Sequence, residues 1–467
     1  MWKIIAVKEI KSGLRDRSLY LVAAFLYILI AFAALTSYLR YRTYSADLNS
    51  SAELFKKEWQ EQHANPHSAA HFGTYLFKPL TTLSLLEPGL SAYTGTTYRV
   101  EAHYQHLLDW SQADQDDGTM RFGELTVAMI FQLLMPLAIV ALGYRSISGE
   151  QEQGTLKMLL SHQVKPVELL SGKILGTYLL LLMTILPVLL ILAAIVLVTD
   201  FSSWEKLTLW IMLHLVYFFM VTAATVIISA GCRKSGSSLL VALLAWMLCT
   251  VILPRSVAFL TDRAHPLPSR HTFNEQLEQG YSKGIDGDKD RDGRYEDYKN
   301  KILKKYGADS VQNLPVNFDG LSMQNSEDYQ SKVFKKYSGI VENILFDQQQ
   351  LYELGTILSP YSALQQLSMG LSGTDIYHHV DFHRQAGSYR DKFIRKLNMD
   401  MAYSGSKYLT YDYQVGPEFF KNMAGFRYHQ PDLTVVLNHH RPAFLGMIIL
   451  LLALVLSIKL FAKNLIS

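Results

Sequence analysis

The sequence predicts an all-α polytopic membrane protein with six transmembrane helices, an amphipathic N-terminal interfacial helix and two mainly helical extracytoplasmic insertions. Six stretches of about 17 to 26 residues contain no Asp, Glu, Lys or Arg, and a helix needs about 20 apolar residues to cross the hydrocarbon core of a bilayer. Two long polar segments, 40–123 and 261–442, interrupt the series. Lys and Arg gather in the short loops of one side, as is typical of membrane proteins.

The flanking charges delimit the six spans. They are expected at 19–39, 124–146, 174–199, 206–232, 235–260 and 443–462. The last stretch is the shortest, but Leu460 and Phe461 continue its apolar run, and Lys459 can extend its amine toward the headgroups.

The short loops predict the orientation. Residues 1–18 contain five basic residues, the loop 147–173 contains three lysines, and the link 233–234 is Arg-Lys. The link 200–205 on the opposite side has no Lys or Arg. Lys206 follows it directly. The positive-inside rule therefore places both termini in the cytoplasm and the two long polar segments outside.

Residues 1–18 suit a helix that lies in the headgroup plane, because apolar side chains share one side of it and basic side chains flank them. The apolar residues are Trp2, Val7, Ile10 and Leu14, and the basic ones are Lys8, Lys11 and Arg15. The alternative is a basic tail that only sets the topology.

Composition argues against other classes of protein. The net charge is +3, and no basic patch suggests a nucleic-acid partner, so membrane lipids are the expected surroundings. The two cysteines, Cys232 and Cys249, lie at or within spans. No disulfide framework is therefore expected in the outer segments, which must fold by ordinary packing.

The most specific local pattern lies in the loop 147–173. It reads Gly-Glu-Gln-Glu-Gln-Gly-Thr-Leu from Gly149, and its leucines recur with the spacing of one helix face. These leucines are Leu156, Leu159 and Leu160. The pattern predicts a short amphipathic helix parallel to the membrane that can receive force. The alternative is that the acids solvate a helix end and Gly154 relaxes the backbone.

This loop resembles the cytoplasmic segment of ABC-2 type transporter permeases: acidic residues, Gly-Thr-Leu, a leucine pair, and Gly172-Lys173 entering the next span. The outer segments resemble, more narrowly, the permeases related to multicopper-enzyme maturation, whose large outer domain has no assigned function. The motifs are Asn65-Pro66-His67-Ser68-Ala69-Ala70-His71, Leu314-Pro315-Val316-Asn317-Phe318, Leu358-Ser359-Pro360-Tyr361 and His378-His379-Val380-Asp381-Phe382.

The resemblance implies a permease subunit of an ATP-driven transporter in the bacterial cytoplasmic (inner) membrane, most often an exporter. It implies two ABC ATPase subunits and a second permease, identical or homologous, as partners. The residues expected at the ATPase contact are Glu150, Glu152, Gly154, Thr155, Leu156, Leu159 and Leu160. The chain has no G-x-x-x-x-G-K-[ST] loop to cradle nucleotide phosphates, so ATP and Mg²⁺ are expected on the partner and no cofactor on this chain.

Two alternatives stay open. In one, the same architecture moves no solute and instead works on an extracytoplasmic partner protein. In the other, the chain is a membrane-bound metal-dependent enzyme, although it has no H-E-x-x-H, G-x-S-x-G or paired-cysteine zinc pattern. The cargo and the direction of transport do not follow from the sequence.

Within the spans, the prolines and one histidine are candidate functional residues. Pro136, Pro187 and Pro254 each free a backbone carbonyl and favour a kink, which a gate could use. His214 is expected to form a hydrogen bond across helices, since an ionisable group inside a membrane rarely lacks a partner.

The outer segments predict helices with defined ends. A polar helix is expected near 51–63, broken at Pro66, which would prevent His63, His67 and His71 from aligning. A long amphipathic helix should stop near Ser359-Pro360. Gly373 should then close a short helix, and Thr374 should cap the next.

Two weak metal patterns occur in the second outer segment. Asp375, His379 and His383 share one helix face and would suit a divalent transition metal. Asp288, Asp290 and Asp292 match the first half of a calcium loop, although position 12 is Lys299 instead of an acid. The alternatives are an exposed polar helix face and a flexible acidic turn.

Overall fold

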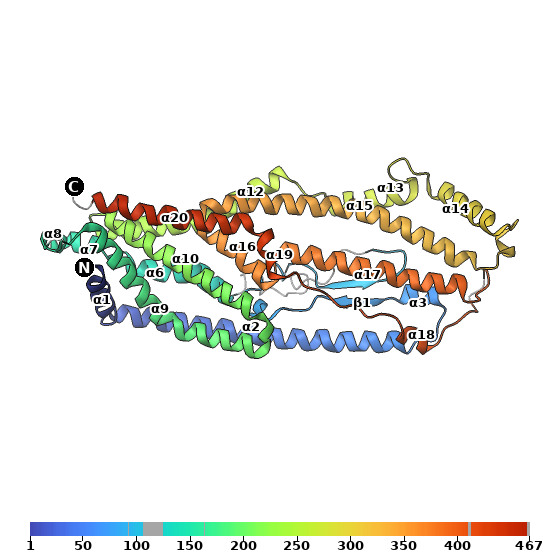
Figure 1. Cartoon of the computed structure of the whole chain (residues 1–467), viewed down its shortest axis with the longest axis horizontal. Coiled ribbons are helices and arrows are strands. Elements are labelled where there is room, and N and C mark those ends of the chain that lie inside the picture. Colours follow the sequence, from blue (N-terminus) through green and yellow to red (C-terminus); the bar gives the residue numbers. More distant parts are fainter. Residues whose placement is uncertain (92, 106–124, 163, 410–411, 465–467) are drawn as a thin grey trace.

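Six helices among the described residues are long and apolar enough to cross a membrane, which confirms the all-α polytopic class. The computed structural model describes residues 1–91, 93–105, 125–162, 164–409 and 412–464. The six candidate spans are Arg17–Gln60, Val127–Glu152, Pro166–Thr199, Phe201–Gly231, Ser235–Ala264 and Arg441–Ala462. The molecule is elongated, and both chain ends lie at the end that carries α1 (Trp2–Gly13) (Figure 1).

The second and fourth candidate spans form the centre of the helical bundle. Helix α10 (Trp204–Gly231) packs against α6 (Met135–Gly143), α9 (Pro166–Thr199) and α20 (Arg441–Asn464). Their shared core contains large aromatic side chains that are fully buried. These are Phe131, Trp210, Tyr217 and Phe218.

Two of the three span prolines follow a turn of π-helix. The π turn η3 (Ile130–Leu134) follows α5 (Val127–Met129) and precedes Pro136. The second π turn, η5 (Leu248–Ile252), joins α11 (Ser235–Met247) to α12 (Leu253–Ala264), and Pro254 lies at the start of α12. Proline lacks an N–H and its ring crowds the preceding turn, so a wider turn there relieves the clash. Pro187 instead lies inside the uninterrupted α9.

The first span continues far beyond the membrane. Helix α2 (Arg17–Gln60) joins the expected span 19–39 and most of the expected polar helix 51–63 into one rod, because no Gly or Pro occurs within it. Its 44 residues extend about 66 Å, roughly twice the thickness of the hydrocarbon core. The second half of α2 therefore forms one side of the part of the molecule beyond the bundle (Figure 1).

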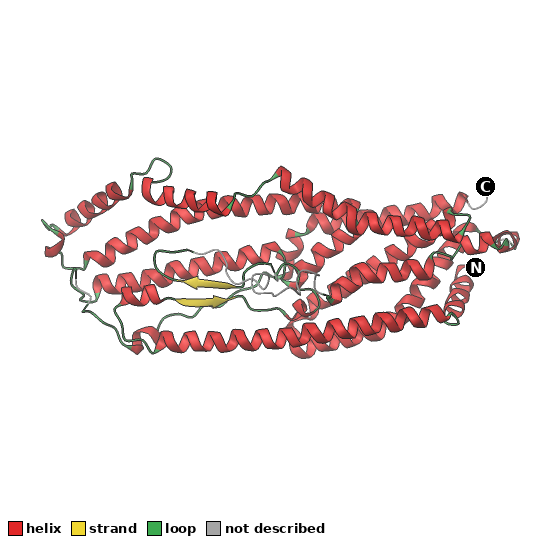
Figure 2. Cartoon of the chain, turned by 180° about the vertical axis from the view of Figure 1, so that it is seen from behind, coloured by secondary structure: helices red, strands yellow, loops and turns green. Residues whose placement is uncertain are grey.

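That part, the distal domain (45–105 and 265–432), combines both insertions. Its helices are α3 (Pro66–Phe72), α13 (Arg270–Lys283), α14 (Arg291–Tyr306), α15 (Phe318–Gly355), α17 (Ile376–Tyr403) and α18 (Pro417–Lys421). A small antiparallel sheet that the sequence did not predict, β1 (Thr74–Phe77) with β2 (Thr97–Val100), pairs Thr74 with Val100. It lies between α2 and α17 (Figure 2).

The core of the distal domain draws on both insertions. Trp59, Leu76 and Tyr98 of the first insertion pack against side chains of the second. The residues of the second insertion are Phe382, Phe393, Leu397 and Phe420. Neither insertion therefore encloses this core by itself.

Helix α16 (Pro360–Ser372) connects the distal domain to the bundle. Pro360 begins it and Gly373 closes it in a left-handed conformation, as predicted. Asp375, and not Thr374, caps α17, because its carboxylate accepts the backbone N–H of His378. Almost every residue of α16 is buried, since the helix packs between α10 and α20.

Short elements complete the described fold. They are η1 (Thr82–Leu85), η4 (Phe201–Ser203), η6 (Val311–Asn313), η7 (Thr356–Leu358) and α19 (Leu433–His439).

Candidate functional site

The segment between the second and third spans folds into two short helices joined by a tight turn. These are α7 (Ser148–Glu152) and α8 (Thr155–Ser161), at the same end of the bundle as α1 and both termini (Figure 1). Gly154 joins them with φ of +76°, a conformation that side-chain-bearing residues rarely adopt. A Cβ atom at this position would meet no heavy atom within 4 Å, so the constraint on a first side-chain carbon comes from the backbone alone.

The apolar face of α8 packs on the chain's own spans. Leu156 is buried, and Leu159 and Leu160 are half-buried against a cluster that includes Ile147 and Val226. The opposite face, with Lys157 and Met158, is exposed. The predicted amphipathic helix therefore exists, and its leucines bind it to the bundle instead of presenting an apolar surface outward.

Lys173 joins three helices through two carboxylates. Its Nζ lies 2.6 Å from Oε1 of Glu150 on α7 and 2.8 Å from Oε1 of Glu9 on α1. The Lys173 side chain is 5% exposed, so it depends on both partners for the solvation that water would otherwise provide. The approach of α1 to α9 requires glycine at 172 and 176, since a Cβ at Gly172 would lie 2.8 Å from the carbonyl oxygen of Trp2.

Glu152 joins the same region to the next span. Its Oε2 accepts hydrogen bonds from the backbone N–H of Ser235, at 3.2 Å, and from the Ser235 hydroxyl, at 2.6 Å. A carboxylate in this position satisfies free N–H groups at the N-terminus of α11 and interacts favourably with the helix dipole. Thr155 donates from its hydroxyl to the carbonyl of Glu150, which holds the turn between α7 and α8.

A buried serine fixes the start of α7. The Ser229 hydroxyl on α10 accepts the backbone N–H groups of Ile147 and Ser148 at 3.1 and 3.0 Å. It also donates to the carbonyl of Tyr144 at 2.7 Å. The segment is thus fastened to α1, α9, α10 and α11.

The carboxylates of Glu150 and Glu152 have partners within the chain, whereas the turn itself is open. Gln153, Gly154, Lys157 and Met158 are exposed around it. The sequence pattern located the segment but not Lys173, Glu9 or Ser235 as its fasteners. The one available signal was the position of Lys173, a basic residue directly before a long apolar run.

Asp375 belongs to a buried charge network and does not share ligand geometry with His379 or His383. Its Oδ2 lies 2.7 Å from Nε2 of His440, and Nδ1 of His440 lies 2.7 Å from Oε1 of Glu353. Burial alone would lower the pKa of His440, but its bonds to Asp375 and Glu353 raise it to about 9. Burial opposes ionisation of Asp375, yet the neighbouring His378 and His440 hold the pKa of its carboxyl well below its usual range.

The other two predicted ligands on α17 have different surroundings. Nδ1 of His383 lies 3.7 Å from Oε1 of Glu342 on α15. Burial, Lys78 and His383 lower the pKa of His379 to about 3. The structure therefore does not bring Asp375, His379 and His383 together around one point.

The three aspartates of the calcium-like stretch also diverge. Oδ2 of Asp288 accepts from Nζ of Lys332 at 2.7 Å and from the Tyr329 hydroxyl at 3.1 Å. Asp290 caps α14 by accepting the backbone N–H of Gly293, and Asp292 is exposed in the first turn of that helix. The stretch starts a helix instead of encircling an ion.

A different set of histidines converges. Helix α2 ends before Pro66, and His63 does not align with the other two histidines, as predicted. The expectation that His67 and His71 would not align is wrong, because Asn65 caps a new helix, α3, and Pro66 occupies its first turn, which proline tolerates. His67 and His71 consequently share one face, with their Nε2 atoms 3.1 Å apart. His63 points elsewhere and pairs with Gln414. Burial, His71 and His103 lower the pKa of His67 to about 4.

His214 bonds within its own helix, which corrects the expectation of a bond across helices. Its Nδ1 lies 2.8 Å from the carbonyl oxygen of Trp210, one turn earlier in α10. Its ring stacks on the Trp210 indole at 3.8 Å between centroids. The Trp210 Nε1–H in turn donates to the Ser368 hydroxyl on α16 at 2.7 Å, so the contact between these helices comes from the tryptophan.

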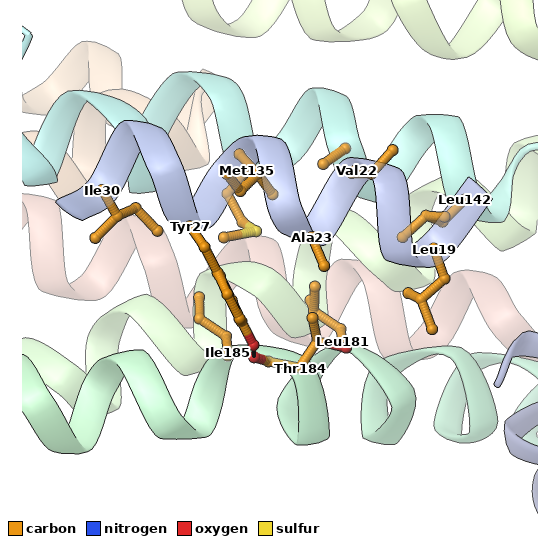
Figure 3. Close-up of a pocket in the computed structure, with 12 residues that line it drawn as sticks. Leu19, Val22, Ala23, Tyr27, Ile30, Met135, Leu142, Leu181, Thr184 and Ile185 are labelled. Atoms are coloured by element: carbon orange, nitrogen blue, oxygen red, sulfur yellow. Dashed lines mark hydrogen bonds between the residues drawn. The ribbon is translucent and has the colours of Figure 1, made fainter. Parts of the chain in front are cut away.

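An apolar pocket lies between α2, α6 and α9 (Figure 3). Tyr27 of α2 reaches across it and donates its hydroxyl to the backbone carbonyl of Thr184 on α9. Its lining includes Leu19, Ile30, Met135, Leu142, Leu181 and Ile185. The lining has no charged side chain, so the pocket has the character of a helix-packing gap and not of a polar binding site.

Comparisons with known proteins agree with this architecture. Residues 62–262 match the family model of the ABC-2 family transporter proteins. Residues 270–429 match a domain of unknown function (DUF3526). A search of curated proteins found no match. The chain is therefore similar to the ABC-2 family transporter proteins over residues 62–262, and its second insertion matches a domain of unknown function.

Proposed function

We propose that this chain is the transmembrane permease subunit of an ABC transporter, and that a separate ATPase drives it through the α7–α8 turn. The match of residues 62–262 to the ABC-2 family model supports a transport subunit with an ATPase partner. The observation that carries the site assignment is the fastening of the α7–α8 segment to four helices beneath an exposed turn. A force applied there reaches the bundle without first deforming a flexible loop.

The proposed contact surface is the exposed turn, and the two glutamates transmit force behind it. Gln153, Gly154, Lys157 and Met158 are exposed and free to meet another protein. Glu150 passes a displacement to α9 and α1 through Lys173, and Glu152 passes it to α11 through Ser235. Since α10 packs on α16, the motion continues to the base of the distal domain.

The proposed orientation has the α7–α8 turn and both termini in the cytoplasm and the distal domain outside, across the inner membrane of a bacterium. The support is the excess of Lys and Arg in residues 1–18, 147–173 and 233–234. The elements that contain these residues gather at one end of the molecule (Figure 1). The ATPase subunits would then reach the turn from the side where ATP is available.

The complete transporter would contain two ATPase subunits and a second permease, identical or homologous, and would export its cargo. Support comes from α11 and α12, whose outer faces carry a run of exposed large apolar side chains. These include Leu240, Leu244, Met247, Leu248 and Phe259. A second permease could cover this face within the bilayer.

A second candidate function, mechanical work on an outer partner protein, is favoured by the rigid continuity of two helices. Helix α2 extends without a break from the bundle into the distal domain, and α15 is a single helix of 38 residues that ends beside α16. Helices of this length transmit displacement with little loss. The distal domain would then act on a partner protein outside.

The test is ATP turnover in the purified assembly with two matched substitutions at one position. Gly154→Asn tolerates the left-handed backbone and adds a small side chain, whereas Gly154→Trp fills the exposed surface. We expect Gly154→Asn to retain coupled turnover and Gly154→Trp to lose most of it, with both variants inserted normally. Unchanged turnover in Gly154→Trp would remove the contact role from this turn.

A further inference from the structure

We infer that the distal domain binds a divalent transition-metal ion through His67, His71 and His103. Among the described residues, these three histidines offer ligand nitrogens that all lie within 4.8 Å of one another. Two come from α3 and the third from the segment after β2. Imidazole nitrogen is a preferred ligand of Zn²⁺ and Cu²⁺.

The spacing of the nitrogens matches a tetrahedral site. Zn–N bonds of about 2.0–2.1 Å at tetrahedral angles separate two ligand nitrogens by about 3.3 Å. The Nε2 atoms of His67 and His71 are 3.1 Å apart. The ring of His103 completes the group, with its centroid 5.0 Å from that of His71 and 5.6 Å from that of His67.

A buried carboxylate orients the third ligand. Oε1 of Glu327, on α15, lies 3.0 Å from Nδ1 of His103 and also accepts the backbone N–H of His103 at 2.6 Å. A carboxylate on Nδ1 fixes the imidazole tautomer and leaves Nε2 as the ligand, the arrangement common behind metal-binding histidines. Glu327 is itself held by Arg390, which is 1% exposed.

The backbone at His103 is strained, as expected where a side chain must be aimed. Its φ of +65° is unusual for a residue other than glycine and costs on the order of 1–2 kcal/mol. This conformation lets both its N–H and its ring meet the same Glu327 oxygen. The strain therefore fixes His103 in the direction of His67 and His71.

The site would remain open on one side. His71 is exposed, whereas His67 and His103 are half-buried. Three protein ligands with one accessible position describe a site that can exchange its ion or coordinate an outside molecule, in contrast to a closed four-ligand structural site. The ion would also join the first insertion to α15 and α17, which hold Glu327 and Arg390.

The simpler explanation of the 3.1 Å contact is a hydrogen bond between two neutral imidazoles without any metal. Zn²⁺ binding separates the two cases. The full-length chain in detergent is loaded with Zn²⁺ and dialysed against metal-free buffer. The retained zinc is measured by mass spectrometry, and the zinc affinity is measured by competition with a chromophoric chelator. We expect one zinc per chain, and Co²⁺ in its place should give the absorption of a tetrahedral site.

The variants identify the ligands. His71→Ala changes an exposed side chain and should fold normally while weakening zinc binding more than about 100-fold, and Glu327→Gln should weaken it about 10- to 100-fold. His63→Ala, an exposed histidine before the same helix, should bind like the parent. The joint variant His379→Ala, His383→Ala tests the other predicted site and should also keep its zinc.

Three outcomes would overturn the inference. They are a parent chain that retains no zinc, a His71→Ala variant with unchanged affinity, and a loss of zinc confined to the joint His379→Ala, His383→Ala variant. Because thermal melting of each variant without metal is measured beside zinc retention, a folding defect in Glu327→Gln is recognised and His71→Ala alone then decides.

Discussion

Lys173 illustrates how one residue can hold a short helical segment to a membrane bundle. It lies nearly buried between Glu150 and Glu9, and it replaces the water that the two carboxylates would otherwise need. A buried cation between two acids contributes little net stability compared with an apolar contact, but its removal leaves unpaired charge. Its value lies in geometry, because it fixes α7 and α1 relative to α9.

Replacing Lys173 with Met should therefore lower the stability of the segment by about 3 kcal/mol, since two carboxylates lose their shared partner. The joint variant Lys173→Met, Glu150→Gln removes one of these charges and should recover part of the loss. Apparent melting temperatures of the purified chain provide the measurement. A single variant as stable as the parent would show that the ion pairs do not hold α7.

His440 predicts how stability depends on pH. Its pKa of about 9 in the folded chain exceeds the usual histidine value of about 6.5, so its contribution is complete below pH 6.5 and is lost as the pH rises toward 9. Stability should fall by up to about 2 kcal/mol between pH 6.5 and 8. Above pH 8 Lys78 acts in the opposite direction, because burial lowers its pKa to about 8.

Comparing the parent with a variant between pH 6.5 and 8 separates His440 from the other buried histidines. His67 and His379 have lowered pKa values and are neutral in the folded chain throughout this range, and the loss of protons from their unfolded forms near pH 6.5 opposes the decline equally in parent and variant. In a His440→Gln variant the decline in melting temperature should disappear while the overall stability is lower. An equal decline in parent and variant would assign the pH dependence to another group.

At the scale of elements, hydropathy predicted the spans because their length and lack of charge follow directly from the bilayer. The ends of elements were harder to predict. Pro66 follows the end of α2, as predicted, but it also begins α3, and Asp375 was interpreted as a ligand and instead caps α17. Proline can end one helix or begin the next, and aspartate can bind a metal or cap a helix. The backbone conformation at each position decides between the two roles, and the sequence does not show that conformation.

Tertiary contacts account for the features that the sequence did not predict. The strands β1 and β2 are four residues each, too short for a recognisable alternating pattern, and they form because α2 and α17 cover them. The histidine cluster likewise joins His103 to residues more than 30 positions earlier and to Glu327 more than 200 positions later. From the sequence, His67 and His71 were named, but Pro66 was expected to prevent them from aligning, and His103 was not named.

At the scale of the whole molecule, the distal domain is one folding unit assembled from two insertions. The family match to the domain of unknown function covers residues 270–429, yet the core beneath it contains Trp59, Leu76 and Tyr98 from outside that range. The ring centroid of Trp59 lies 4.6 Å from the ring centroid of Phe393 and 5.1 Å from that of Phe420. The first span and the domain of unknown function are therefore coupled through one side chain near the end of α2.

This coupling predicts that Trp59→Ala in the full chain loosens residues 270–429, although Trp59 lies outside them. Loss of a buried tryptophan costs about 3–5 kcal/mol through lost burial and the cavity left behind. Hydrogen exchange and limited proteolysis should show protection falling across α15 and α17 while the spans stay protected. Leu54→Ala truncates an exposed side chain on the same helix and should change neither. If protection in residues 270–429 is equal in both variants, then this domain folds independently of α2. A movement of the first span could then not be transmitted to the domain through Trp59.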